Sequence, residues 1–430
     1  MLVYVQNISP RFKYIISFLG SFYNCKINYT TKVEEYINYS GYRINYSSHS
    51  LTETELWIKP HGLLLEDFIH EVEVVCIQHE GGFKVIFPTD DDLGFDILSA
   101  IFYLLSRYEE YLPHKKDMYG RYAHENSIAF KNDLLHLPLI NIWLEYLKKV
   151  IESKTGFQIA DPEFHYQPTY DIDIAWSYRN KGILRNAGAM LRSLTQFNFK
   201  EVHERLLVLS GKKADPYDTY NWMEQLNQDY NLKPIYFFHV GSGRSGYDKN
   251  ILPTNKQLQQ LIKSLAVKNS IGLHPSWSSG DKEDEILKEK KMLEKISGIR
   301  ITKSRQHYIR FTLPGTFRKL LEAGIEEDFS MGYGSINGFR ASIASSFYWY
   351  DLQREKQTNL LIHPFCFMDA NSFYEQKQNP DQTSNELMHY LSEVKKVKGT
   401  LITIWHNNFF GTDTIFEGWK EVYERFLNKL

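Results

Sequence analysis

The chain has 430 residues, of which 43% are hydrophobic and 24% charged, and its formal net charge is −2. This length predicts two domains, the composition is that of a globular protein, and the slight negative charge gives no overall attraction for nucleic acid. The only cysteines are Cys25, Cys76 and Cys366, which argues against a disulfide framework and against a cysteine-based zinc site.

Residues 1–160 are predicted to form a smaller N-terminal α/β domain. The segments YRINYSS and GFKVIFPT have the alternation or the apolar runs of strands, and residues 95–112 carry apolar side chains at helical spacing. The charged segment RYEEY in this helix is predicted to be a solvated edge. Residues 1–20 lack the order of a signal peptide, and no apolar run reaches the roughly 18 residues of a membrane span, so we expect a cytoplasmic protein without a transmembrane segment.

From residue 163 to residue 430 the pattern changes to alternating strands and helices. This order predicts a mainly parallel sheet covered by helices and is typical of a barrel of β/α units. The strand-like segments are YQPTYDIDIA, KPIYFFHV, SIGLHPS, ITKSRQHYI, IEEDFSM, NLLIHPFCF and TLITIWHNN. Residues 178–214 interrupt the rhythm with a basic, helical segment. We interpret this segment either as an ordinary helical excursion or as a surface for an anionic membrane or an acidic glycan.

Polar side chains gather where the predicted strands end. In a parallel barrel the carboxyl ends of all strands meet at one rim, and active sites are built there. Carboxylates and imidazoles together suit a divalent metal such as zinc, and a second carboxylate can take a proton from water. Residues i and i+2 of a strand share a face, so a cation could compensate both carboxylates of one strand. The residues at the predicted ends are Asp171, Asp173, His274, Arg305, His307, Tyr308, Asp328 and His406.

Five segments, in order, resemble the motifs of the NodB-type polysaccharide deacetylases, carbohydrate esterase family 4. They are TYDID (169–173), IGLHPSWS (271–278), RQHY (305–308), EEDFS (326–330) and TIWH (403–406). The segments FDILSAIFYLLSRYEEYL and DMYGRY resemble the uncharacterised N-terminal region of a divergent branch of this family in Bacteroidetes. The resemblance implies an incomplete (β/α) barrel. It also implies metal-dependent removal of N-acetyl groups from amino sugars of a surface polysaccharide or its precursor.

The resemblance further implies a role for each motif residue. Asp171 would be the general base, Asp173 and His274 metal ligands, Arg305 the residue that orients the base, Tyr308 the donor of a backbone amide to the oxyanion, His406 the general acid, and Asp328 a supporting residue of the fourth motif.

Three positions depart from the family's motifs. Ile172 separates the two aspartates, so their roles could be exchanged. Ser278 stands where the family has its second metal histidine, and His307 stands in place of a proline. We expect His307 to restore the lost ligand and the metal to be zinc, with Ser278 as the alternative ligand. If neither serves, the metal site has only two ligands and the domain is inactive.

Two other functions stay open at this point. A glycosyltransferase would use Asp171 and Asp173 as a D-x-D motif that holds Mn²⁺ on the diphosphate of a sugar nucleotide, but this leaves His274 and His406 unexplained. A non-catalytic glycan-binding module would instead hold sugar rings with aromatic side chains. The candidates for such contacts are Trp277, Trp405, Phe409 and Phe410.

Overall fold

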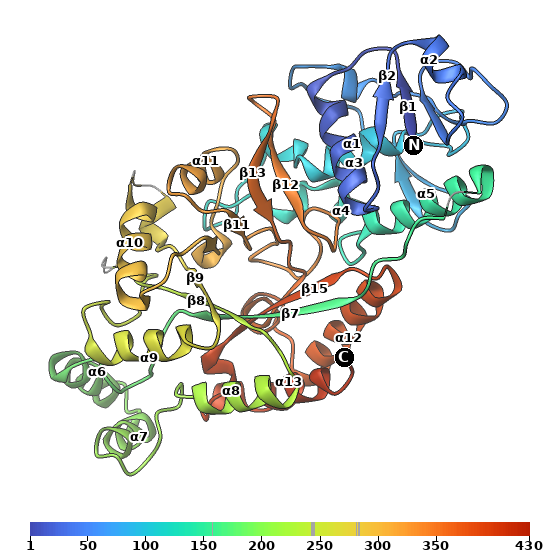
Figure 1. Ribbon diagram of the computed structural model, residues 1–430. Coiled ribbons are helices and arrows are strands. Elements are labelled where there is room, and N and C mark those ends of the chain that lie inside the picture. The colour runs from blue at the N-terminus through green and yellow to red at the C-terminus, as the bar shows by residue number, and fades with distance from the viewer. Residues whose placement is uncertain (157, 242–245, 281, 283) are drawn as a thin grey trace.

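The chain contains two large β-sheets in which the strands are mainly parallel. The computed structural model describes residues 1–156, 158–241, 246–280, 282 and 284–430 (Figure 1). Within these ranges a four-stranded sheet lies in the N-terminal part, and a nine-stranded sheet lies in the C-terminal part.

The N-terminal sheet has the order β2-β1-β3-β4, and its strands pair in parallel. Helix α1 starts because Pro10 suits the first helical turn and the Ser9 side chain accepts a hydrogen bond from the amide of Phe12. The elements of this part are β1 (Leu2–Val5), α1 (Pro10–Phe22), β2 (Asn28–Thr30), α2 (Val33–Ile37), β3 (Arg43–Tyr46), β4 (Leu56–Ile58), β5 (Cys76–Gln78), β6 (Lys84–Ile86), α3 (Ile97–Leu105), α4 (Ile128–Lys131) and α5 (Leu139–Thr155).

The helix predicted for residues 95–112 is shorter than expected. Helix α3 ends at Leu105, Arg107 adopts a left-handed backbone with φ of 54°, and a 3₁₀ turn follows at Tyr108–Tyr111. The prediction that RYEEY is a solvated edge is wrong, because the turn carries Arg107 and Glu110 into the interior. Arg340 donates hydrogen bonds of 2.9 and 2.6 Å to the Glu110 carboxylate, and Arg107 donates one of 2.8 Å. The periodicity of the sequence could not reveal Arg340 as the partner of Glu110, because Arg340 lies in the C-terminal part of the chain.

Glu110 provides a test of how firmly the two parts are joined. Burial alone would raise the pKa of Glu110, but Arg340 and Arg107 lower it to about 2. We expect Glu110→Gln to lower the free energy of unfolding by about 3–5 kcal/mol at pH 7, because two buried guanidinium groups lose their carboxylate. Since the folded pKa is below the ordinary 4.5, the stabilisation is complete above pH 4.5 and is lost as the pH falls toward 2.

Urea denaturation of both proteins at several pH values checks this prediction. The difference between wild type and variant should stay constant from neutral pH to about pH 5 and narrow below it. Glu326→Gln is the control, because Glu326 pairs with Arg300 on the surface and such pairs contribute about 1 kcal/mol or less. Equal stability of Glu110→Gln and wild type would contradict the prediction.

The C-terminal sheet has the order β12-β13-β11-β10-β9-β8-β7-β15-β14. All its pairs are parallel except β12 with β13, and the edge strands β12 and β14 do not pair with each other in the described part of the chain. The predicted α/β class with an incomplete barrel is therefore confirmed. The strands are β7 (His165–Ile172), β8 (Ile235–Phe238), β9 (Ser270–Leu273), β10 (Lys303–Ser304), β11 (Glu327–Asp328), β12 (Phe347–Asp351), β13 (Lys356–Ile362), β14 (Phe367–Met368) and β15 (Thr400–His406).

Helices connect these strands, as parallel pairing requires. They are α6 (Ile183–Thr195), α7 (Phe199–Leu209), α8 (Tyr220–Asp229), α9 (Lys256–Ala266), α10 (Glu285–Ser297), α11 (Gly315–Glu322), α12 (Pro380–Lys396) and α13 (Trp419–Leu427). The basic segment 178–214 contains α6 and α7, which lie at the lower left of Figure 1, away from the N-terminal sheet. None of the helices in the described ranges is long and apolar enough to cross a bilayer.

The N-terminal and C-terminal parts share one hydrophobic core. Tyr14 of α1 lies 4.9 Å from the ring of Tyr350, and its hydroxyl donates to the carbonyl of Tyr348 at 2.8 Å. Asn141 of α5 donates to Ser345 and accepts from the amide of Ala344. The domain boundary near residue 160 stays a prediction. These contacts show that the segments on its two sides pack against each other.

Candidate active site

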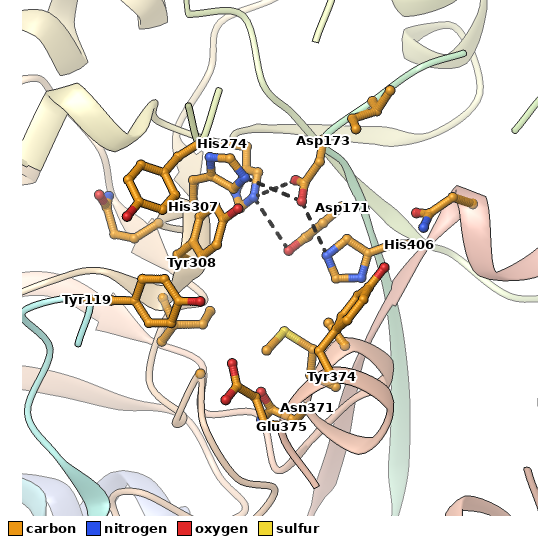
Figure 2. A pocket seen from close by; sticks show the side chains of 18 of the residues that line it. Tyr119, Asp171, Asp173, His274, His307, Tyr308, Asn371, Tyr374, Glu375 and His406 are labelled. Carbon is orange, nitrogen blue, oxygen red and sulfur yellow. Dashed lines mark ion pairs between the residues drawn. The ribbon is translucent and has the colours of Figure 1, made fainter. Parts of the chain in front are cut away.

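The carboxyl ends of β7, β9 and β15 and the turn after β10 surround one pocket of about 540 Å³ (Figure 2). Asp171 is directly opposite His406 in the pairing of β7 with β15, so the two residues reach the rim together. The predicted residues that line the pocket are Asp171, Asp173, His274, His307, Tyr308 and His406. The structure thus brings six of the predicted residues to one place, as expected for strands that run in parallel.

Asp173 lies at the centre of the polar group. Its Oδ1 is 3.0 Å from Nε2 of His274, and its Oδ2 is 3.4 Å from Nε2 of His307 and 3.6 Å from Nε2 of His406. Burial would raise the pKa of Asp173, but the charge of His307 and the close imidazole nitrogens of His274 and His406 hold it well below its usual value. Figure 2 shows the three rings gathered around this carboxylate.

Three side chains could hold a metal ion. The ligand atoms of Asp173, His274 and His307 lie within 4.8 Å of one another. Oδ1 of Asp173 is buried and makes no hydrogen bond among the described residues, although an imidazole nitrogen faces it closely. A cation between the two atoms would satisfy both. One carboxylate and two imidazoles also match the three-ligand zinc sites that leave a position for water.

His307 and not Ser278 belongs to this group. The Oγ of Ser278 lies 3.1 Å from Oγ of Ser276, and Ser278 does not line the pocket, whereas His307 does. On the other side of the imidazole, Nδ1 of His307 is 3.2 Å from Oδ1 of Asp248. Burial would lower the pKa of His307, but Asp173 and Asp248 raise it to about 9. Asp248, which no sequence motif marked, thus orients His307 as carboxylates orient metal-binding histidines.

The choice between the two ligands gives a direct prediction. His307→Ala should weaken zinc binding at least 10–100-fold, since even residues that only orient ligands have roughly this effect. Ser278→Ala should bind zinc as the wild type does. Zinc titration with a competing chelator measures both affinities, and circular dichroism checks that both variants fold. The reverse order of affinities would show that the serine completes the site.

Asp171 is held by a buried arginine. Nη1 of Arg305 donates to Oδ1 of Asp171 at 2.7 Å and to Oγ1 of Thr169 at 2.8 Å, and its guanidinium lies 4.4 Å from the ring centre of Phe237. The other carboxylate oxygen of Asp171 lies 3.8 Å from Nε2 of His274. One oxygen is therefore fixed by the arginine, while the other faces the candidate metal group. This is the arrangement that the implied roles of Asp171 and Arg305 require.

His406 is paired with an aspartate that the motif comparison did not identify. Nδ1 of His406 lies 2.6 Å from Oδ1 of Asp369, and the backbone amide of His406 donates to Oδ2 at 2.7 Å. Burial would lower the pKa of His406, but Asp369, Asp173 and Asp171 raise it to about 10. The pairing with Asp369 therefore favours the protonated form of the imidazole. The one signal in the sequence is that Asp369 follows an apolar, strand-like run.

Asp328 does not have the place expected for a catalytic residue. It is fully buried, accepts hydrogen bonds from the hydroxyls of Ser304 and Ser330, and does not line the pocket. Burial raises its pKa to about 6 against the effect of these hydrogen bonds. The prediction of a catalytic Asp328 is corrected here: the aspartate that supports His406 is Asp369.

The predicted aromatic contacts are correct only in part. Trp405 is fully buried against Phe367 and Tyr423, because neighbouring residues of a strand point to opposite faces and His406 takes the pocket face. Phe410 is also buried in the core, whereas Phe409 lines the pocket. Trp277 lies behind the wall, where it stacks on Tyr247 at 4.0 Å. The prediction that Trp405 touches substrate is therefore wrong, and Trp277 is a second-layer residue behind Tyr247.

The N-terminal part also reaches the pocket. Tyr119 and Arg121 line it, and Nη1 of Arg121 donates to the carbonyl of Tyr308 at 2.8 Å. Tyr308 has a left-handed backbone with φ of 59°, a strained conformation that this contact helps to hold. We find no acceptor for the Tyr308 N–H among the described residues, so the amide is free for the oxyanion role that the resemblance implies. Sequence reasoning had given the N-terminal part no role.

Residues 1–156 match a family of unknown function, DUF7033, and no curated protein matches the chain. Among solved structures, a protein described as a polysaccharide deacetylase from Mycobacterium smegmatis is 14% identical, with a TM-score of 0.39 over 63% of this chain and 87% of its own. A polysaccharide deacetylase from Bacillus cereus is 11% identical, with a TM-score of 0.30 over 61% of this chain and 89% of its own. A pseudoenzyme of carbohydrate esterase family 4 from Bacillus anthracis is 11% identical, with a TM-score of 0.29 over 63% of both chains.

Proposed function

We propose that this chain is a metal-dependent hydrolase that removes N-acetyl groups from amino sugars of a glycan or its precursor, with zinc as the metal. One observation carries the proposal. The arginine-held carboxylate of Asp171, the group around Asp173 and the carboxylate-paired His406 face the same pocket from different strands. These are the three parts that metal-assisted amide hydrolysis uses: a base, a cation site and an acid.

Asp173, His274 and His307 would hold the cation, which when bound polarises a carbonyl oxygen and makes water more acidic. Asp171 takes the proton from the attacking water. Arg305 fixes the orientation of the Asp171 carboxylate through the 2.7 Å hydrogen bond. The backbone amide of Tyr308 donates to the oxygen that becomes negative in the tetrahedral intermediate.

His406 acts in the second half of the reaction. An amine leaves poorly unless it is protonated, and Asp369 holds Nδ1 of His406 so that Nε2 faces the pocket. After the proton moves to the amine, the carbon–nitrogen bond breaks and acetate and the free amino sugar result. The pocket of about 540 Å³ is large enough for a sugar unit, and Tyr119, Tyr308 and Tyr374 offer ring faces to it.

The two other functions fit the pocket less well. In a glycosyltransferase both aspartates would bind Mn²⁺, but Oδ1 of Asp171 is taken by Arg305, and imidazoles surround Asp173 where oxygen ligands suit Mn²⁺ better. Binding a glycan does not require a buried imidazole that is paired with a carboxylate, as His406 is with Asp369.

Metal analysis and product analysis together test the proposal. The purified protein should contain about one equivalent of zinc. On N-acetylglucosamine oligomers it should release acetate and free amine in equal amounts, stop with a chelator and recover with zinc. Asp173→Ala and His274→Ala should lose both the metal and the activity while keeping the fold. Manganese binding that depends on a sugar nucleotide would favour the transferase, and glycan binding without metal would favour the binding module.

A further inference from the structure

Helix α6 turns its apolar side away from the protein. Ile183, Leu184 and Leu191 are 88%, 90% and 64% exposed, whereas the polar Asn186 and Ser193, on the side that packs against α7, are only 6% and 3% exposed. A surface helix of a globular protein normally buries its apolar stripe and exposes its polar one. Helix α6 instead leaves its apolar stripe exposed and packs two polar side chains against α7. No other part of the described chain covers the apolar stripe.

Hydrogen bonds with α7 fix this orientation. Arg205 of α7 donates to Oδ1 of Asn186 at 2.9 Å, and the hydroxyl of Ser193 donates to Glu201 of α7 at 2.9 Å. Rolling α6 to bury its leucines would break these bonds and leave buried polar groups unsatisfied. The two helices therefore hold the apolar side outward.

The exposed apolar side continues around the turn between the helices. We call it the hairpin face, and it consists of Ile183, Leu184, Leu191, Leu194, Phe197 and Phe199. Phe197 and Phe199 are 79% and 61% exposed. A groove of about 630 Å³ runs along α6, lined mainly by apolar side chains that include Met190 and Leu209. Contiguous exposed apolar surface of this kind marks an interaction site.

Positive charge surrounds the hairpin face. Residues 178–214 contain eight lysines and arginines and two glutamates, whereas the whole chain has a net charge of −2. Arg192 and Lys200 are exposed on α6 and at the start of α7. The charge of the hairpin is therefore opposite in sign to that of the rest of the molecule.

A polar pocket of about 520 Å³ lies beside the hairpin face, and Lys181, Arg185 and Lys200 are among its lining residues. Glu201 and Glu204 also line it, but each is already paired, with Arg205 and Lys213. Burial and then the charge of Arg185 lower the pKa of Lys181 to about 8. Asp413 lines the pocket as well, and its Oδ1 accepts a hydrogen bond from the amide of Ile415. Five basic and three acidic side chains thus line the pocket, which leaves an excess of positive charge.

We propose that the α6–α7 hairpin docks the protein on an anionic lipid bilayer. The hairpin face enters the boundary between headgroups and acyl chains, and the basic residues contact lipid phosphates. An apolar helix side bordered by lysine and arginine is typical of helices that lie in the membrane surface. The charge complementarity favours a bilayer over a neutral protein partner, and the hairpin projects from the body on the side away from the N-terminal sheet (Figure 1).

Vesicle co-sedimentation of the full chain tests the proposal. The wild type should bind vesicles that mix phosphatidylcholine with phosphatidylglycerol and should leave phosphatidylcholine vesicles in solution. The triple variant Ile183→Ser, Leu184→Ser, Leu191→Ser should lose binding. Arg192→Gln with Lys200→Gln should weaken binding roughly tenfold or more and reduce its dependence on salt. Val267→Ser is the matched control, since Val267 is 83% exposed at the end of α9 and outside the hairpin.

Circular dichroism shows whether the variants fold. The double variant Phe197→Ser, Phe199→Ser changes the turn and leaves α6 intact. It replaces the triple variant in the binding test if the triple variant misfolds. Binding of both apolar variants at wild-type level, or no binding of the wild type to anionic vesicles, would overturn the proposal. If the wild type is a dimer that does not bind vesicles and the triple variant is a monomer, the hairpin face binds a second copy of the chain, and the proposal is overturned. No substrate is used, so the result does not depend on the proposed enzymatic function.

Discussion

Replacing Asp171 by asparagine should lower the rate of acetate release by about 10²–10⁴-fold, the usual contribution of a general base. An amide cannot take the proton of the attacking water. Zinc binding should be nearly unchanged, because Asp171 is not in the group formed by Asp173, His274 and His307. Steady-state rates on an N-acetylglucosamine oligomer and zinc content of the same preparations test both statements.

The same experiment decides which aspartate is the base. If Asp173 took the proton and Asp171 bound the metal, Asp171→Asn would lose zinc and Asp173→Asn would keep it. The structure predicts the opposite, because Arg305 holds Asp171 and the three imidazoles surround Asp173. Asp328→Asn is a useful control, since Asp328 is a buried aspartate outside the pocket. It should change stability more than turnover, and a loss of turnover as large as that of Asp171→Asn would contradict the assignment.

Replacing His406 by alanine should nearly abolish amide hydrolysis but spare part of the hydrolysis of an aryl ester. An amine needs a proton before it leaves, whereas an aryl oxide leaves as a stable anion. The ratio of esterase to deacetylase activity should therefore rise in His406→Ala, with a loss on the amide of about 10²–10⁴-fold. It should not rise in Asp171→Asn, where both reactions lack the base. Parallel assays with p-nitrophenyl acetate and an N-acetylated sugar give the ratio.

Asp369 refines this test. Asp369→Asn keeps the shape of the side chain but removes the charge that supports the protonated imidazole, so it should shift the ratio in the same direction by a smaller amount. Equal losses of ester and amide hydrolysis in His406→Ala would show that another residue protonates the amine. His307 would then be the next candidate, because it is the other imidazole near Asp173 with a raised pKa.

Some features of this protein follow from the sequence alone. Apolar runs separated by helical segments determine the α/β class, and six of the eight polar residues selected at the ends of these runs line the pocket. Asp171, His274 and His406 could be selected in this way because parallel strands bring their carboxyl ends to one edge whatever the details of packing. The sequence of residues 178–214 likewise predicted a basic helical segment, and α6 and α7 form there.

Other features depend on partners that are distant in the chain, and only the tertiary structure decided them. Asp369 reaches His406, Asp248 reaches His307, and Arg340 reaches Glu110 because separate strands and turns meet in space, not because of any local spacing. The same holds for α6, whose amphipathic pattern is visible in the sequence. Which side faces solvent was decided by hydrogen bonds from α7, because periodicity defines two sides of a helix but not the surface against which either one packs.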